Sequence, residues 1–127
     1  MGAGLALQIR NKWPKVYKQY CSFCEGYQNG KAIKLLGCVQ DVVVDNDLVV
    51  ANCFGQVYPG SGLRTDYDAW DKILPQLLND SIYFNECALH FPWMIGCGLA
   101  GGDWNIMSRK IVDFFKDTSI PVYIHKY

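Results

Sequence analysis

The sequence has no excess charge of either sign and no long apolar run. Its 127 residues carry 12 Lys plus Arg and 12 Asp plus Glu, so the formal net charge is zero. That balance argues against a broad basic face for nucleic acid or for an anionic membrane surface. No apolar run approaches the roughly 20 residues that span a bilayer. The N-terminus lacks a basic stretch followed by an apolar segment, which argues against a secretory signal. We therefore expect a cytoplasmic protein without a membrane-embedded part.

Several motifs for catalysis and for metal binding are missing as well. Cys21 and Cys24 have the spacing of two metal ligands, but no second Cys-x-x-Cys or Cys/His pair completes a set of four. The six cysteines are expected to stay reduced. No glycine-rich segment continues into Gly-Lys-Ser/Thr, and no Gly-x-Ser-x-Gly elbow is present. His90 and His125 are interpreted as strand or surface histidines. We predict no metal site and no cofactor.

The chain has enough apolar residues for one compact core. Half of its residues are apolar and 14% are aromatic. Its length lies near the commonest domain size, which predicts a single domain over residues 1–127. A domain of this size buries roughly two-thirds of the surface of its unfolded chain, so it needs neither a disulfide nor a metal to hold it together.

The periodicity of apolar residues predicts helices that alternate with strands. A helix is predicted over residues 4–20, bent or split by Pro14. A first strand is predicted over 32–39, followed by a hairpin that turns at Asp45-Asn46-Asp47. A loop is predicted at 59–62, followed by a helix from Thr65 or Asp66 to about Leu78. Pro75 is expected to kink this helix or to end it near Leu74. The remaining predicted elements are a strand over 87–91, a helix from Asp103 to about Lys116 and a strand over 121–125. This order predicts an α/β fold, with helices on both faces of a sheet whose later strands are parallel.

Two glycine-rich segments, Met1–Leu5 and Gly96–Gly102, each precede a predicted helix. Glycine allows positive φ and a close approach of the backbone to a ligand. Successive N–H groups and a helix N-terminus together suit a diphosphate without any lysine. The alternative is that these glycines only permit tight turns, and the presence of two such segments favours a phosphate site.

Longer stretches around both segments resemble the macro domain family. Residues 1–8, Met-Gly-Ala-Gly-Leu-Ala-Leu-Gln, are similar to the family's first phosphate loop and helix, and residues 95–104 are similar to its second loop. Cys24-Glu25-Gly26, Asn52–Gln56 and Thr65-Asp66-Tyr67 follow in family order, so the resemblance covers nearly the whole chain. It implies a three-layer α/β/α fold with a mixed sheet, and ADP-ribose bound at the C-terminal ends of strands. The branch it resembles is that of phage and microbial proteins that process ADP-ribose 1″-phosphate.

The resemblance also implies a set of site residues. The implied ligand-binding residues are Gly2, Ala3, Gly4, Leu5, Gly96, Cys97, Gly98, Leu99, Ala100, Gly101 and Tyr67. Gln56 and Asp103 are the candidates for catalysis, with Asp103 positioning water. Asp103 also suits the cap of the last helix, which we favour, and Tyr67 also suits a half-buried helix position. Tyr58 belongs to the same loop region as Gln56, and Phe54 and Trp104 are expected to pack in the core rather than stack on a ribose.

The sequence departs from the family pattern in two places. Family members begin with two strands before the first glycine loop, whereas this sequence starts at the loop. We therefore expect an N-terminally shortened domain whose exposed strand edges could pair in a homo-oligomer. Phe54-Gly55-Gln56 and Ala100 stand where related hydrolases have a lysine and an acid, which does not support a covalent lysine route.

The implied function is binding of ADP-ribose with hydrolysis of ADP-ribose 1″-phosphate. A non-catalytic ADP-ribose-binding module, a hydrolase that removes ADP-ribose from macromolecules and an inactive remnant stay open as alternatives.

Overall fold

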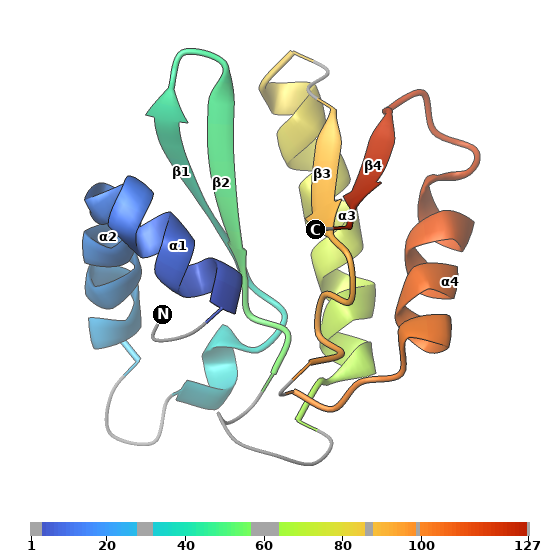
Figure 1. The fold of residues 1–127 in the computed structure, drawn as a ribbon, viewed down its shortest axis with the longest axis horizontal. Helices are drawn as coiled ribbons and strands as arrows, with labels where there is room; N and C mark the ends of the chain where they lie inside the picture. The colour runs from blue at the N-terminus through green and yellow to red at the C-terminus, as the bar shows by residue number, and fades with distance from the viewer. Residues whose placement is uncertain (1–3, 28–31, 57–63, 86–87, 99, 127) are drawn as a thin grey trace.

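The computed structural model describes residues 4–27, 32–56, 64–85, 88–98 and 100–126 (Figure 1). The first described segment forms two helices, α1 (Gly4–Lys12) and α2 (Pro14–Glu25). Pro14 is the first residue of α2, where the N–H that proline lacks would have no partner within the helix. The predicted split at Pro14 is confirmed, and α2 continues to Glu25 instead of ending at Tyr20.

The predicted hairpin is confirmed. Strands β1 (Val39–Asp45) and β2 (Leu48–Cys53) pair antiparallel, with Val42 opposite Val50, and Asn46 and Asp47 connect them. The β-branched residues on both strands favour this extended pairing.

The strand predicted over 32–39 is wrong. The segment begins with a 3₁₀ helix, η1 (Ala32–Leu35), and the strand starts only at Val39. Gly37 takes a φ of +86° and donates its N–H to Phe54 O at 2.8 Å. This left-handed turn at the end of the hairpin prevents one continuous strand from running through the segment.

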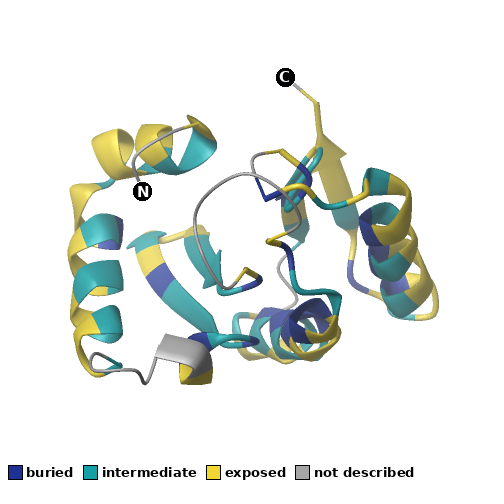
Figure 2. Cartoon of the chain, turned by 90° about the horizontal axis from the view of Figure 1, so that it is seen from below, coloured by how far each residue is buried: buried dark blue, intermediate teal, exposed yellow. Residues whose placement is uncertain are grey.

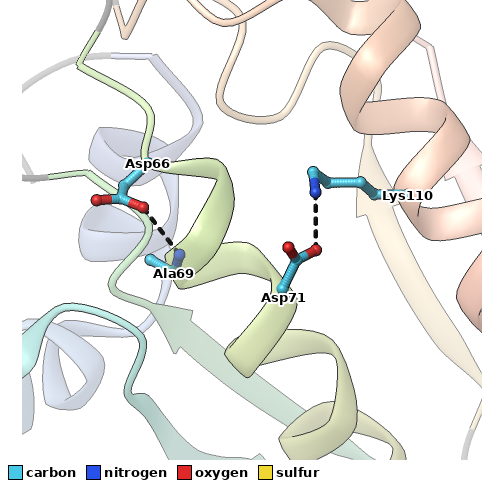
Figure 3. A network of polar contacts seen from close by, with 4 residues as sticks. All are labelled: Asp66, Ala69, Asp71 and Lys110. Atoms are coloured by element: carbon cyan, nitrogen blue, oxygen red, sulfur yellow. Dashed lines mark hydrogen bonds and ion pairs between the residues drawn. The ribbon is translucent and has the colours of Figure 1, made fainter.

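Helix α3 (Tyr67–Tyr83) is longer than predicted. Asp66 caps it, accepting a hydrogen bond from the Ala69 N–H at 2.9 Å (Figure 3). The helix does not end near Leu74 or Leu78, but passes through Pro75 and continues to Tyr83. Burial of one apolar face on both sides of Pro75 outweighs the hydrogen bond that proline cannot donate. The residues of that face are Ala69, Trp70, Ile73, Leu74 and Leu77.

The last predicted elements are confirmed. Strands β3 (Leu89–Pro92) and β4 (Val122–His125) pair parallel, and helix α4 (Trp104–Phe115) connects them. The cap of α4 is Asp103, whose side chain accepts from the Asn105 N–H at 2.8 Å.

The strand pairs are packed between helices. Gln40 of β1 donates to Gln19 O of α2 at 2.9 Å, while the adjacent Asp41 points to Asp80 of α3. The hairpin therefore lies between α2 and α3, as Figure 2 shows from below. α3 and α4 meet one face of the β3–β4 pair in a single core, which includes Trp70, Ile73, Leu74, Leu77, Phe91, Cys97, Met107, Ile111 and Phe115.

The structure is therefore an α/β fold with both antiparallel and parallel strand pairs, as the sequence predicts. The described strands form two separate two-stranded sheets. Among the described helices, none combines the length and the apolar character needed to cross a bilayer.

Candidate functional site

The second glycine loop, residues 96–102, connects β3 to α4. At three of its positions the backbone conformation or a close contact requires glycine. Gly96 and Gly101 both have a φ of +73°, in the left-handed region that side chains disfavour. A Cβ atom at Gly102 would lie 2.5 Å from Gly96 O. The tight-turn interpretation therefore accounts for these three residues.

Gly98 differs from its neighbours. It is exposed, and its φ is outside the left-handed region. Apart from its two neighbours in the chain, no described residue has a heavy atom within 4 Å of a Cβ atom built on it. The chain path does not require glycine there, so the open space beside Gly98 is the part of the loop that can receive a ligand.

Residues Arg64–Tyr67 are joined to the second glycine loop by hydrogen bonds, and we call them the anchoring segment. The N–H groups of Arg64 and Thr65 donate to Ala100 O at 2.6 and 3.1 Å. The Thr65 hydroxyl donates to Gly96 O. The Asp103 N–H donates to the Tyr67 hydroxyl at 2.9 Å. Both ends of the loop are thus fixed to the start of α3.

Thr65 connects α3 to the second glycine loop, a contact that its sequence position does not predict. Its sequence position indicates only a possible helix cap, because a threonine before a helix is common to many helix starts. Its contacts with Gly96 and Ala100 join residues more than thirty positions apart, and the local pattern does not contain that information. Tyr67 is half-buried at the start of α3, and its hydroxyl lies at the end of the loop. Its ligand-binding role stays a prediction.

Cys97 and Ala100 lie in the loop with their side chains buried. Burial, together with the charge of Asp103, raises the pKa of the Cys97 thiol. The Cys97 N–H donates to Met94 O at 2.8 Å, so its N–H is engaged within the protein and its thiol is buried. Ala100 contributes its carbonyl to the anchoring segment.

The two candidate catalytic residues both adjoin the anchoring segment. Asp103 is a helix cap in this structure, with Oδ1 accepting from Asn105, which confirms the cap role. Gln56 is exposed and forms an isolated antiparallel bridge with Thr65. The structure therefore brings both residues to the second glycine loop. Their catalytic role stays a prediction.

The first glycine loop is described only in part. Its residues Gly2 and Ala3 are outside the described residues. The same holds for Leu99 of the second loop and for Tyr58. Gly4 begins α1 with a φ of +56° and is exposed, and Leu5 is half-buried. Figure 1 shows the start of α1 and the second glycine loop at the same end of the molecule, where β2 and β3 finish. Within the described part of the chain, no hydrogen bond joins Gly4 or Leu5 to the second loop.

Phe54 and Trp104 pack inside the fold, as expected. The Phe54 ring stacks on Tyr20 and on Phe23, with centroids 5.9 and 5.6 Å apart. Trp104 packs against the core around α3.

Other polar groups lie away from the second glycine loop. An open groove of about 340 Å³ between α3 and α4 is lined by Asp71, Leu74, Arg109, Lys110, Asp113 and Phe114. Lys110 and Asp71 pair there at 2.8 Å (Figure 3), which neutralises both charges. None of the described residues of the second glycine loop lines this groove.

A second polar cluster joins β1 to the C-terminal half of α3. Burial, a hydrogen bond with Asp80 and the charge of Asp80 raise the pKa of Asp41 to about 7. The nearby Cys53 thiol has a pKa raised to about 12 by burial and by both carboxylates. No group of three or more potential ligands that could hold a metal ion occurs in the part of the chain that the structure describes.

Comparison with known proteins shows relatives along nearly the whole chain. No protein-family model matches the sequence. An ADP-ribose 1″-phosphate phosphatase of Saccharomyces cerevisiae is 28% identical, and the alignment covers 96% of this chain and 81% of that protein.

Solved structures share the fold. A protein of unknown function from Bacteroides thetaiotaomicron is 31% identical with a TM-score of 0.80, over 98% of this chain and 78% of that one. A macrodomain protein from Streptomyces coelicolor is 27% identical with a TM-score of 0.77, again over 98% and 78%.

Proposed function

Because the chain belongs to the macrodomain family, we propose that it binds ADP-ribose or a close derivative, with the diphosphate on the second glycine loop. The observation that carries this proposal is the open space beside Gly98, in a loop that the anchoring segment holds in place. The name of the yeast relative supports the ligand class.

The loop can bind a diphosphate without a cationic side chain. Residues 96–103 contain no Lys or Arg, and α4 begins directly after them. The N-terminus of a helix carries about half a positive charge, which favours an anion placed beside it. A loop fixed before the ligand arrives loses less conformational entropy on binding.

We further infer that the protein hydrolyses ADP-ribose 1″-phosphate to ADP-ribose and phosphate. A water oxygen attacks phosphorus, the bond from phosphorus to the ribose oxygen breaks, and the leaving oxygen takes a proton. Gln56 and Asp103 are assigned to orient the water. The cap of α4 occupies Asp103 Oδ1, so the second carboxylate oxygen is the one assigned to this role. Donors of the loop stabilise the developing negative charge, which is commonly the largest catalytic contribution.

The test is release of inorganic phosphate from ADP-ribose 1″-phosphate. Gln56→Ala is expected to lower kcat. Asp103→Ser separates the two roles of Asp103, because serine keeps a good helix cap and removes the carboxylate. The phosphatase assignment of Asp103 predicts a fall in kcat of at least tenfold, with an unchanged melting temperature. An unchanged kcat in this variant contradicts the assignment.

A non-catalytic binding module is the second candidate. The observation that favours it is the use of Asp103 as a cap, together with Ala100 at the loop position where related hydrolases have an acid. This candidate predicts measurable ADP-ribose binding and a phosphate release rate equal to that of buffer.

A further inference from the structure

Trp70, on the buried face of α3, carries a polar group without a partner. The side chain is 3% exposed, and its indole Nε1–H is buried and has no hydrogen-bond partner among the described residues. Buried donors in folded proteins are nearly always satisfied, so each exception needs an explanation. Leaving such a donor unpaired is costly for the folded state.

The indole nitrogen lies between the end of β2 and the start of the second glycine loop. A Cβ atom built on Gly55 would be 2.3 Å from Trp70 Nε1, and one built on Gly96 would be 3.7 Å from it. Gly55 therefore makes room for this edge of the indole, and Gly96 lies at ordinary contact distance from it. Gly55 adjoins Gln56, and Gly96 is the first residue of the second glycine loop. The unpaired indole N–H therefore lies next to the backbone of the candidate site.

The acceptors around this donor are already in use. Gly96 O accepts from the Thr65 hydroxyl and from the Gly102 N–H. Gly55 O accepts from the Asp66 N–H at 2.8 Å, and Ala100 O accepts from two N–H groups of the anchoring segment. Each of these carbonyls accepts from another group, and none accepts from Trp70 Nε1. An anionic oxygen of a ligand would supply the missing acceptor.

We propose that the Trp70 indole N–H is a ligand-directed donor, which binds an anionic oxygen of the phosphate-bearing ligand when that ligand occupies the second glycine loop. This inference rests on the proposed function. Nε1 is buried beside the backbone of Gly55 and Gly96, so contact requires a local adjustment of that backbone as the ligand enters. The donor is unpaired in the free protein and paired in the complex, so its hydrogen bond favours the bound state.

The direct test follows the indole N–H by NMR. The chain has four tryptophans, which give four indole signals in a ¹⁵N-labelled sample, and a Trp70→Phe variant identifies the Trp70 signal. On titration with ADP-ribose, we expect this signal to move downfield and to saturate at the dissociation constant that calorimetry gives. If Trp70→Phe does not fold, backbone-based assignment of the wild-type spectrum identifies the same signal.

Affinity provides the second readout. We expect Trp70→Phe to weaken ADP-ribose binding about tenfold, as loss of a hydrogen bond to a charged acceptor predicts. Trp93→Phe is the matched control, since Trp93 is 40% exposed and lies beside Lys126, and its affinity is expected to stay within about twofold of the wild type.

Three results would overturn the inference. One is a Trp70 signal that does not move at saturating ligand. Another is a Trp70 indole proton that exchanges with a bound water in both the free and the saturated protein. The third is a wild-type protein that gives no binding heat with ADP-ribose, and only this result also overturns the proposed function.

Discussion

The four glycines of the second loop differ in what a side chain would meet. Gly96, Gly101 and Gly102 are fixed by backbone conformation or by close contacts, whereas the space beside Gly98 is open. Substitution at Gly98 can therefore test ligand binding without disturbing the fold.

Gly98→Glu is expected to abolish ADP-ribose binding and to leave the melting temperature unchanged, because it adds bulk and negative charge where we place a phosphate. Isothermal titration calorimetry measures the affinity, and thermal unfolding checks the fold. Gly98→Ala is the control, and its affinity is expected to stay within about threefold of wild type, since no described residue beyond its chain neighbours lies within 4 Å of the added methyl group. An unchanged affinity in Gly98→Glu means that the ligand binds elsewhere.

Asp41 provides a residue-scale prediction about stability. Its pKa is raised from the ordinary 3.8 to about 7, chiefly by burial and then by its hydrogen bond and charge interaction with Asp80. The folded protein therefore holds a proton that the unfolded chain releases. The stabilisation is fully present below about pH 4 and is lost as the pH rises through about 7.

Asp41→Asn is expected to remove this pH dependence. Between pH 4 and pH 7, the unfolding free energy of the wild type should fall relative to that of the variant by ~1–2 kcal/mol, a value reduced because the half-exposed site is screened by solvent. Urea unfolding at a series of pH values measures it. Asp47→Asn, in the exposed turn of the hairpin, is the control, and parallel pH profiles of wild type and Asp41→Asn would rule out the proposed cause.

At the scale of elements, the anchoring segment couples the start of α3 to the second glycine loop. Its hydrogen bonds reach Gly96, Ala100 and Asp103. If the loop is the phosphate site, loosening these contacts should weaken ligand binding without any change in the groups that face the ligand.

Thr65→Val removes the hydroxyl donor to Gly96 O while keeping the side-chain shape. We expect a loss of unfolding free energy of ~1 kcal/mol and a weaker ADP-ribose affinity, because the loop is no longer held at its start. Urea unfolding and calorimetry measure the two effects. Thr65→Ser keeps the hydroxyl and should restore both values, and wild-type affinity in Thr65→Val would show that the anchor does not support binding.

The sequence predicted the elements whose signals are local. Pro14 marked the split between α1 and α2, the Asp45–Asp47 turn marked the hairpin, and Asp103 marked the start of α4. The misread elements depend on distant partners. The segment at 32–35 turns around the end of the hairpin, and α3 passes Pro75 because core contacts hold its buried face.

The candidate site was predictable to a similar extent. Its glycine loop and Tyr67 could be found because they form continuous patterns in the sequence. The roles proposed for Thr65 and Trp70 could not be found in this way, because their contacts arise only where β2, α3 and the loop meet. Among the predicted loop residues, the side chain of Cys97 points into the protein, because it is part of the hydrophobic core.

At the scale of the whole molecule, two strand edges stand opposite each other. β2 and β3 run in the same direction and face each other across the centre of Figure 1. Each belongs to a two-stranded sheet, and Ala51 of β2 and Leu89 of β3 pack against the same core. Among the described strands, neither edge has a ladder partner. Unpaired edges of this kind are templates for pairing with another chain.

We therefore predict self-association through these edges. Size-exclusion chromatography with light scattering should give a mass that rises above 14.4 kDa as the concentration increases. The reason is that hydrogen-bonding groups along β2 and β3 find partners in a second molecule. A mass that stays at the monomer value up to millimolar concentration would contradict this prediction.

The central claim is that the second glycine loop binds ADP-ribose, and calorimetric titration of the wild-type chain with ADP-ribose tests it most directly. The account predicts saturable binding of one ligand per chain in the wild type and in Gly98→Ala, and none in Gly98→Glu. Absence of binding heat in the wild type, or equal affinities in the wild type and Gly98→Glu, would contradict it.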